Sequence, residues 1–116
     1  FDESLRKIIL DNAHELGIKI HPNGTVVTIE GPRFSTRAES RMFRSWGADV
    51  INMSIATEAS LANELKIPYT AIAMSTDYDC WKEDEPPVSW EEVLSIFSKN
   101  ANSVIELLLS TIKSLD

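Results

Sequence analysis

The feature that most constrains the fold is the run Ala71-Ile72-Ala73-Met74-Ser75-Thr76-Asp77-Tyr78-Asp79-Cys80-Trp81, in which small and apolar residues stop abruptly at two aspartates. A short apolar run without polar alternation is typical of a strand buried on both faces. Open parallel sheets bind ligands beyond the carboxyl ends of their strands, so Asp77 and Asp79 would stand beside a ligand. Residues i and i+2 of an extended segment point the same way, so both carboxylates could contact one molecule. The alternative is that Asp77 ends the strand and Asp79 caps a turn.

Length and charge limit the classes of protein to consider. The 116 residues make one domain or part of one, and 43% hydrophobic and 25% charged residues are ordinary for a soluble globular protein. The net charge of −7 argues against nucleic acid as the main partner, because that binding depends on Lys and Arg. No apolar run approaches a membrane span, and the first residues do not resemble a signal peptide. The single cysteine, Cys80, cannot form an internal disulfide, which favours a reducing compartment and a cytoplasmic location.

The hydrophobic periodicity predicts alternating helices and strands. Two capping boxes, Thr36 with Glu39 and Ser89 with Glu92, mark helix starts, and Gly17 and Gly47 mark helix ends. Val88 and Val93 have the spacing of a hydrophobic staple. The predicted helices cover 3–16, 37–46, a short stretch with Leu61, Ala62 and Leu65, and about 25 residues after Ser89; the predicted extended segments are 18–21, 25–29, 50–54 and the run from Ala71.

The same periodicity predicts which helix faces point inward. On the second helix these residues are Ala38, Met42 and Trp46. On the last helix they are Val93, Phe97, Ala101, Val104, Leu108 and Leu115.

The alternation of helices and strands predicts an α/β domain. Three or four strands are fewer than an average sheet contains, and the long last helix has a large apolar face to cover. We therefore interpret residues 1–116 as the C-terminal portion of a single domain whose sheet is completed by an N-terminal half.

Three motifs stand out in the chain: Glu30-Gly31-Pro32-Arg33-Phe34-Ser35-Thr36-Arg37-Ala38-Glu39-Ser40, Trp46-Gly47-Ala48-Asp49-Val50-Ile51-Asn52-Met53-Ser54 and Thr76-Asp77-Tyr78-Asp79-Cys80-Trp81. Together they resemble one family, the 5'-methylthioadenosine phosphorylases of the trimeric purine nucleoside phosphorylase group. The resemblance implies a phosphorylase/hydrolase-like fold with a mixed sheet flanked by helices. It also implies a pentosyltransferase that cleaves methylthioadenosine with phosphate, giving adenine and 5-methylthioribose 1-phosphate in purine and methionine salvage. Phosphate is the co-substrate, and no metal or organic cofactor is implied.

The resemblance assigns the two aspartates to the purine. Asp77 would be the catalytic acid that donates a proton to N7, and Asp79 would accept a hydrogen bond from the 6-amino group. Protonating N7 makes adenine a better leaving group, which is general-acid catalysis. Burial and a neighbouring carboxylate both raise the pKa of a carboxyl, so a pair of aspartates suits this role. The opposite division of roles between the two stays open.

The resemblance gives five further residues a role. Phe34 would pack on the base, although a plain core role is the alternative. Ser35, where relatives specific for 6-oxopurines have glutamate, and Asp77, where they have asparagine, would favour 6-aminopurines. Met53 would lie against the ribose, and Ser54 would donate its hydroxyl to phosphate. Trp90 stands where a small apolar residue would line the pocket for the 5'-substituent, so it bears on specificity.

The family's main phosphate-binding segments lie in the N-terminal half, outside this sequence. The implied partners are that N-terminal half and further copies in a trimer or hexamer, with no nucleic acid and no membrane. Two alternatives remain open: a phosphorylase with a broader range of 6-aminopurine nucleosides, and a non-catalytic fragment that binds adenine or assists assembly.

Overall fold

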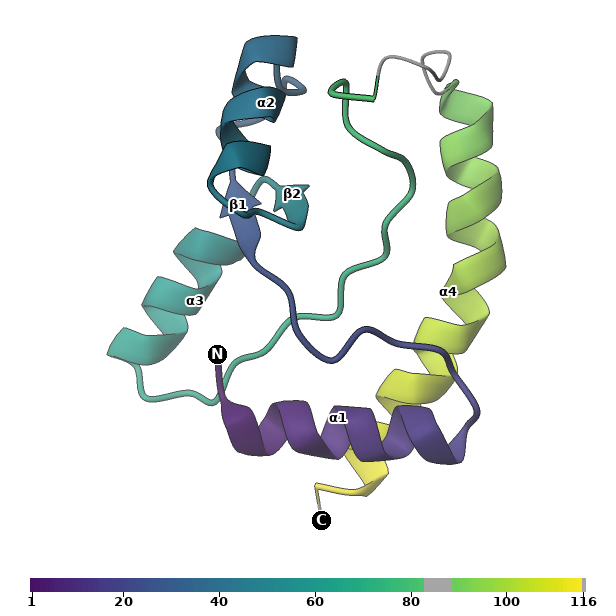
Figure 1. Ribbon diagram of the computed structural model, residues 1–116. Coiled ribbons are helices and arrows are strands. Elements are labelled where there is room, and N and C mark those ends of the chain that lie inside the picture. Colours follow the sequence, from purple (N-terminus) through teal and green to yellow (C-terminus); the bar gives the residue numbers. More distant parts are fainter. Residues whose placement is uncertain (83–88, 116) are drawn as a thin grey trace.

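The computed structural model describes residues 1–82 and 89–115, and it confirms the predicted α/β class. Helix α1 lies across one end of the molecule, α4 rises from it, and residues 70–82 run between the strands and α4 (Figure 1). The elements are α1 (Glu3–Glu15), β1 (Val26–Thr28), α2 (Arg37–Ser45), β2 (Val50–Asn52), α3 (Ile55–Glu64) and α4 (Trp90–Lys113).

The sheet of the described residues is smaller than the sequence predicts. β1 and β2 pair in parallel, with Val26 opposite Val50 and Thr28 opposite Asn52. Residues 18–21 and 71–76 pair with no strand in the described part of the chain, so the predicted mixed sheet of three or four strands is not formed there. The physical reason is that a strand exists only where a neighbouring strand accepts and donates its backbone hydrogen bonds.

The predicted helix boundaries are confirmed by the caps. Both capping boxes form: Thr36 with Glu39 opens α2, and Ser89 with Glu92 opens α4. Gly17 and Gly47 follow α1 and α2 with φ of 67° and 79°, the left-handed conformation that ends a helix. The predicted staple between Val88 and Val93 involves a residue outside the described ones.

The predicted inward face of α2 is wrong. The helix buries Ser40 and Phe43, whereas Ala38, Met42 and Trp46 are exposed. Hydrophobicity indicates which side chains gain from burial, but it does not show which face of the helix has a neighbour.

The predicted inward face of α4 is also partly wrong. Ala101 and Val104 are half-buried as expected, but the residues that become fully buried are Leu107 and Thr111. Among the predicted stripe, Phe97, Leu108 and Leu115 are exposed. The cause is that α1 packs against α4, and this contact selects the face that carries Leu107.

The core lies where α1 meets α4. Ile9, Ala13 and Leu107 form it, surrounded by the partly buried Leu5, Ile18, Ile20 and Ile72. The buried Asn12 joins the two helices: its side-chain nitrogen donates to the Ile8 carbonyl at 2.8 Å and to the Ser114 hydroxyl at 3.1 Å, and its oxygen accepts from Ser110. A packed apolar cluster and a satisfied buried amide thus fix one helix on the other.

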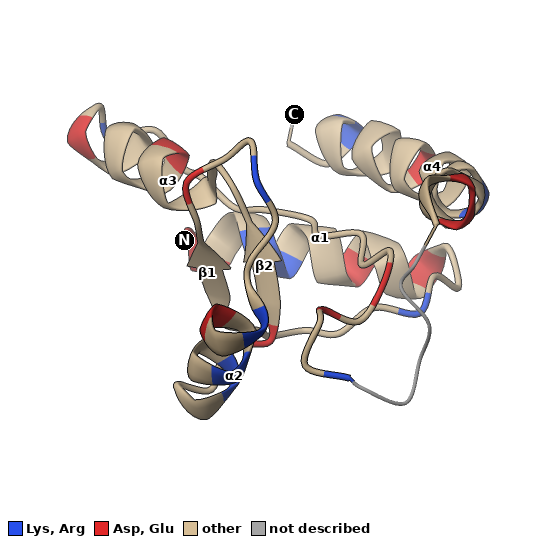
Figure 2. Ribbon diagram, turned by 90° about the horizontal axis from the view of Figure 1, so that it is seen from above, with Lys and Arg blue, Asp and Glu red and all other residues tan. Residues whose placement is uncertain are grey.

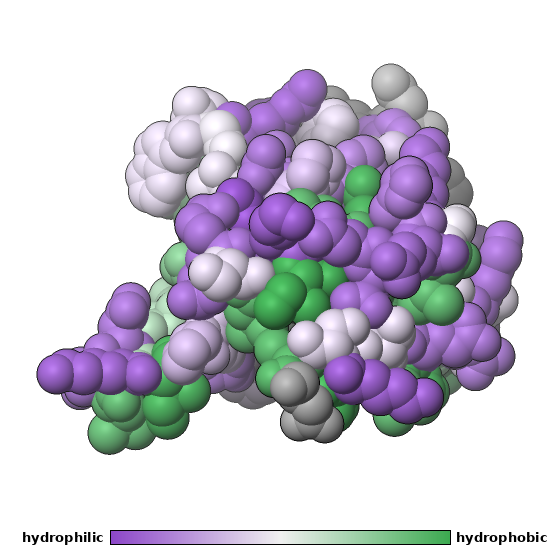
Figure 3. Space-filling model, turned by 90° about the horizontal axis from the view of Figure 1, so that it is seen from below, coloured by the Kyte–Doolittle hydropathy of each residue, from purple (hydrophilic) through white to green (hydrophobic). Residues whose placement is uncertain are grey.

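The chain exposes much more surface than a compact protein of its mass. Its accessible area is 8805 Å², whereas a folded 13.0 kDa monomer exposes about 6,300 Å². Hydrophobic side chains lie open between hydrophilic ones on the face shown in Figure 3. Within residues 1–82 and 89–115, none of the helices combines the length and the hydropathy that a membrane span requires.

Candidate active site

The parallel pairing of β1 and β2 brings two predicted site segments to one edge. The loop after β1 and the residues after β2 both leave from the carboxyl ends of their strands. They touch at Gly31 and Met53: a Cβ added to Gly31 would lie 2.7 Å from the Met53 Sδ, closer than real atoms approach. A side chain at position 31 would therefore require the flexible Met53 side chain to shift.

A serine and an aspartate connect this edge to the third segment. The Ser35 hydroxyl donates to the Asp79 carboxylate, with distances of 3.1 and 3.0 Å to its two oxygens. The Cys80 backbone N–H donates to Asp79 at 2.9 Å, and the Cys80 thiol lies 3.6 Å from the Ser35 carbonyl oxygen. Residues 44 positions apart in sequence are thus joined, and two predicted purine-binding side chains lie within hydrogen-bond distance.

The loop that carries Phe34 is held from both sides. Arg33 donates to both carboxylate oxygens of Glu39, at 2.8 and 2.6 Å. The hydrogen bond from Arg33, together with those from Thr36, lowers the pKa of Glu39 to about 2. Between these residues Phe34 is 82% exposed, so it packs into no core of the described residues.

Ser54 is the residue that precedes α3, at its N-terminal end. The side chain of Ser54 does not cap the helix; its hydrogen bond to Glu58 is the largest cause of the lowered pKa of that carboxyl. The N–H groups of Ile55 and Ala56 instead donate to Asn52 at 3.3 Å and Thr28 at 3.0 Å, at the ends of β2 and β1.

Two predicted residues are not drawn into this cluster. Asp77 is exposed, and its carboxylate accepts a hydrogen bond from the adjacent Thr76 hydroxyl at 2.7 Å. Trp90, the first residue of α4, is 65% exposed and makes no hydrogen bond or ring contact with the other predicted residues in the described part of the chain. Residues 1–82 and 89–115 contain no group of three His, Cys, Asp or Glu side chains arranged to hold a metal ion.

The sequence interpretation missed a set of ring contacts beside the two aspartates. The Arg44 guanidinium lies over the Trp81 ring, 3.8 Å from its centroid. Trp81 meets Tyr78 edge to face at 6.0 Å, and the Lys82 amine lies 3.8 Å from the Tyr78 centroid. The abundance of aromatic residues around Asp79 was the available signal, but it could not identify Arg44 as the partner.

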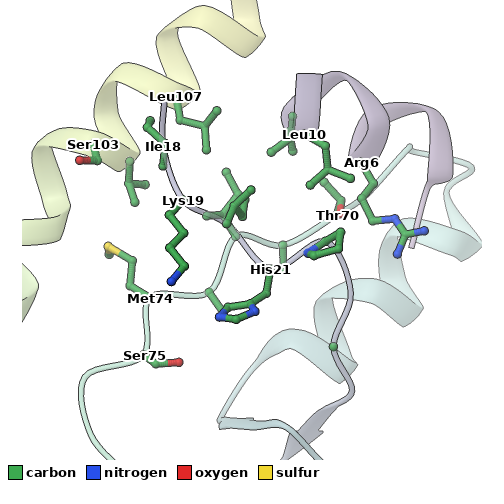
Figure 4. A pocket seen from close by; sticks show the side chains of 18 of the residues that line it. Arg6, Leu10, Ile18, Lys19, His21, Thr70, Met74, Ser75, Ser103 and Leu107 are labelled. Atoms are coloured by element: carbon green, nitrogen blue, oxygen red, sulfur yellow. The ribbon is translucent and has the colours of Figure 1, made fainter. Parts of the chain in front are cut away.

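A cavity among the described residues lies elsewhere. It has a volume of about 930 Å³, and we call it the groove. Its walls come from α1, residues 16–24, residues 70–75 and the middle of α4, and none of the predicted site residues lines it. Lys19, His21 and Met74 line it, and Leu107 of α4 and Leu10 of α1 lie above them in the view of Figure 4.

Comparison with known proteins identifies the family. A model described as the phosphorylase superfamily matches residues 1–113. The S-methyl-5'-thioadenosine phosphorylases of Xenopus tropicalis and Danio rerio are each 52% identical over 115 residues, which cover 99% of this chain and 41% of each relative. The chain therefore belongs to the phosphorylase superfamily.

Solved structures agree in fold. Methylthioadenosine phosphorylase from Schistosoma mansoni in complex with adenine has a TM-score of 0.90 and 38% identity, over 99% of this chain and 46% of that one. A variant of the adenosine/methylthioadenosine phosphorylase from the same organism, in complex with methylthioadenosine, has a TM-score of 0.87 and 37% identity, over 99% of this chain and 44% of that one. The chain thus spans less than half the length of the relatives that it matches.

Proposed function

We propose that this chain supplies the purine site and part of the ribose and phosphate site of an enzyme that cleaves 5'-methylthioadenosine with phosphate. The observation that carries the proposal is the Ser35–Asp79 contact, because it joins segments far apart in sequence beside the strand ends of a phosphorylase-superfamily fold. The names of the most similar relatives support the choice of substrate.

In the proposed reaction, phosphate attacks C1' of the ribose while the C1'–N9 bond breaks. The electrons of that bond pass to adenine, and the Asp77 carboxyl donates a proton to N7. General-acid catalysis of this kind contributes about 10² to 10⁴ in rate. Asp79 and Ser35 recognise the purine edge, Phe34 packs on the base, and Met53 lies against the ribose.

Phosphate is the co-substrate, and we propose no metal or organic cofactor. Ser54 donates its hydroxyl to phosphate near the N-terminus of α3, an end of a helix that favours anions. Trp90, at the start of α4, shapes the pocket for the 5'-substituent. The lone Cys80 suits a reducing compartment such as the cytoplasm.

The proposed partner is the rest of the same polypeptide, bound in the groove. The chain exposes about 2,500 Å² more surface than a compact monomer of its mass, which is the size of an extensive interface. Residues 71–75 line the groove, and their backbone has no strand partner in the described part of the chain, so an added strand would satisfy it. The complete protein would then assemble into a trimer or hexamer.

The test is phosphate-dependent release of adenine from methylthioadenosine by the full-length protein. We expect turnover with the full-length protein, loss of turnover without phosphate, and no turnover by residues 1–116 alone. Activity of the isolated 116 residues would contradict the proposed division of the site.

Two further substrates separate the proposal from its alternatives. Adenosine turnover equal to that of methylthioadenosine would favour a broader 6-aminopurine nucleoside phosphorylase. Inosine turnover at that level would contradict the specificity assigned to Ser35 and Asp77. Adenine binding without turnover by the full-length protein would favour a non-catalytic adenine-binding protein.

A further inference from the structure

The segment that carries both aspartates lacks the support that regular structure gives. Residues 77–82 form no helix or strand, and side chains provide their contacts with the rest of the described chain. The Ser35 hydroxyl holds Asp79. For Asp77 the hydrogen bond shown comes from the adjacent Thr76, which moves with the same segment and cannot anchor it.

We propose that Arg44 and Trp81 are positioning residues that hold the Asp77–Asp79 segment against α2, an inference that rests on the purine site proposed above. The Arg44 guanidinium lies over the Trp81 ring, and the Trp81 ring meets the edge of Tyr78. Tyr78 stands between the two aspartates in sequence. Fixing its ring therefore restricts the backbone on both sides and holds Asp77 as well as Asp79.

Arg44 stands on a fixed base. It lies in the last turn of α2, where a cation interacts favourably with the helix dipole. The preceding residue, Phe43, is buried and its carbonyl accepts the backbone N–H of Ala48 at 3.1 Å. The start of the same helix is fixed by the Thr36–Glu39 capping box. A contact with Arg44 therefore ties residues 78–82 to a helix whose two ends are both held.

The contact depends on a flat cation. An Arg guanidinium can lie parallel to an indole face, whereas a Lys ammonium is a compact charge that keeps its water more strongly. Trp81 is half-buried, whereas Arg44 is exposed, so the contact covers the indole face and leaves the cation near water. The proposal thus predicts that Arg44→Lys, which keeps the charge, holds residues 77–82 against α2 less firmly than Arg44 does.

The experiment compares Arg44→Gln, Arg44→Lys and Trp81→Leu in the full-length protein. Arg37→Gln is the matched control, because it removes the same charge from the first turn of the same helix. Figure 2 shows basic residues in blue on α2. Hydrogen–deuterium exchange of residues 77–82 is measured first, since it requires no activity. We expect exchange about two- to tenfold faster in Arg44→Gln and Trp81→Leu, an intermediate rate in Arg44→Lys, and no change in Arg37→Gln.

Steady-state kinetics gives the second readout. Arg44→Gln and Trp81→Leu should raise the KM for the nucleoside about two- to tenfold and leave the KM for phosphate unchanged. A general loss of folding would raise both, so this split distinguishes positioning from damage. Full activity with unchanged exchange in Arg44→Gln, or Arg44→Lys equal to the unmodified protein, would overturn the proposal. If the unmodified protein has no activity, the proposed function fails, while the exchange measurement still decides the role of Arg44.

Discussion

The two sides of the molecule differ in how they are held together. At the strand-end edge, the Met53 side chain lies against Gly31 and the Ser35 hydroxyl bonds to Asp79, so direct contacts join three separate segments. At the groove, apolar and polar residues surround about 930 Å³, and residues 71–75 line it without a strand partner in the described part of the chain. Contacts within this chain hold the edge, whereas the backbone of residues 71–75 has no strand partner in the described part of the chain. The comparison indicates that the described residues fix the edge by themselves and leave residues 71–75 unpaired beside the groove.

The largest expected effect tests whether the edge is the reacting site. Asp77→Asn in the full-length protein should lower kcat/KM for methylthioadenosine about 10²- to 10⁴-fold, because an amide cannot donate the acid proton. Asp11→Asn is the control, since Asp11 is an exposed aspartate of α1 that pairs with Lys7. The measurement is adenine release at saturating phosphate. An unchanged rate in Asp77→Asn, with a loss in Asp79→Asn, would transfer the acid role to Asp79.

The next effect tests the packing beneath the groove. Leu107 is 1% exposed and lies between Ile9 and Ala13 of α1, so Leu107→Ala should lower the free energy of unfolding by about 2 to 5 kcal/mol. Urea unfolding of the full-length protein measures it. Leu109→Ala on the same helix, 55% exposed, should cost less. Equal losses for the two variants would mean that the rest of the protein buries both faces of α4. The groove side would then depend on residues outside this chain, whereas the edge depends on contacts within it.

How much of this could be predicted from sequence depends on the range of each interaction. The Thr36–Glu39 and Ser89–Glu92 boxes and the glycines after α1 and α2 were predicted correctly, because each depends on residues a few positions apart. The periodicity gave α4 but selected Leu108 instead of Leu107 as a buried residue. Which face is buried depends on α1, almost a hundred positions earlier, and the sequence pattern carries no such information.

The candidate site shows the same division. The resemblance supplied Ser35 and Asp79, which the structure brings together, but the roles of these residues remain predictions. The contact of Arg44 with Trp81 could not be predicted, because charged and aromatic residues are common and their pairing depends on the path of two loops. The groove was missed for a related reason. The apolar pattern of residues 18–21 and 71–76 predicts strands, but the pattern of a strand does not show which strand pairs with it.

A smaller effect tests the connection between Ser35 and Asp79. Ser35→Ala removes one hydrogen bond to a carboxylate, so it should raise the KM for methylthioadenosine about three- to tenfold with little change in unfolding free energy. Ser45→Ala is the control, since the Ser45 hydroxyl bonds only locally to the Met42 carbonyl. Steady-state kinetics and urea unfolding of the two variants provide the comparison. A KM unchanged by Ser35→Ala would show that the edge recognises the purine without this bond.

The smallest effect tests the ion pair that braces the Phe34 loop, and its sign follows from the pKa of Glu39. The hydrogen bond from Arg33 lowers this pKa from its ordinary value of 4.5 to about 2 in the folded protein. The folded state therefore favours the ionised carboxylate, and the stability that it contributes is present above about pH 4.5 and is lost as the pH falls toward 2. Glu39→Gln keeps a side chain that suits a capping box but removes the charge. The urea midpoint of Glu39→Gln should thus lie slightly below that of the unmodified protein at pH 6, and the two should converge near pH 2.

In an Arg33→Gln background the dependence on pH should become weaker, because the main cause of the shifted pKa is absent. The effect is small because exposed ion pairs contribute little, and added salt should reduce it further. If the two midpoints still differ at pH 2, the stability difference would come from the geometry of the helix cap and not from the charge. The loop that carries Phe34 would then be held by hydrogen bonds alone.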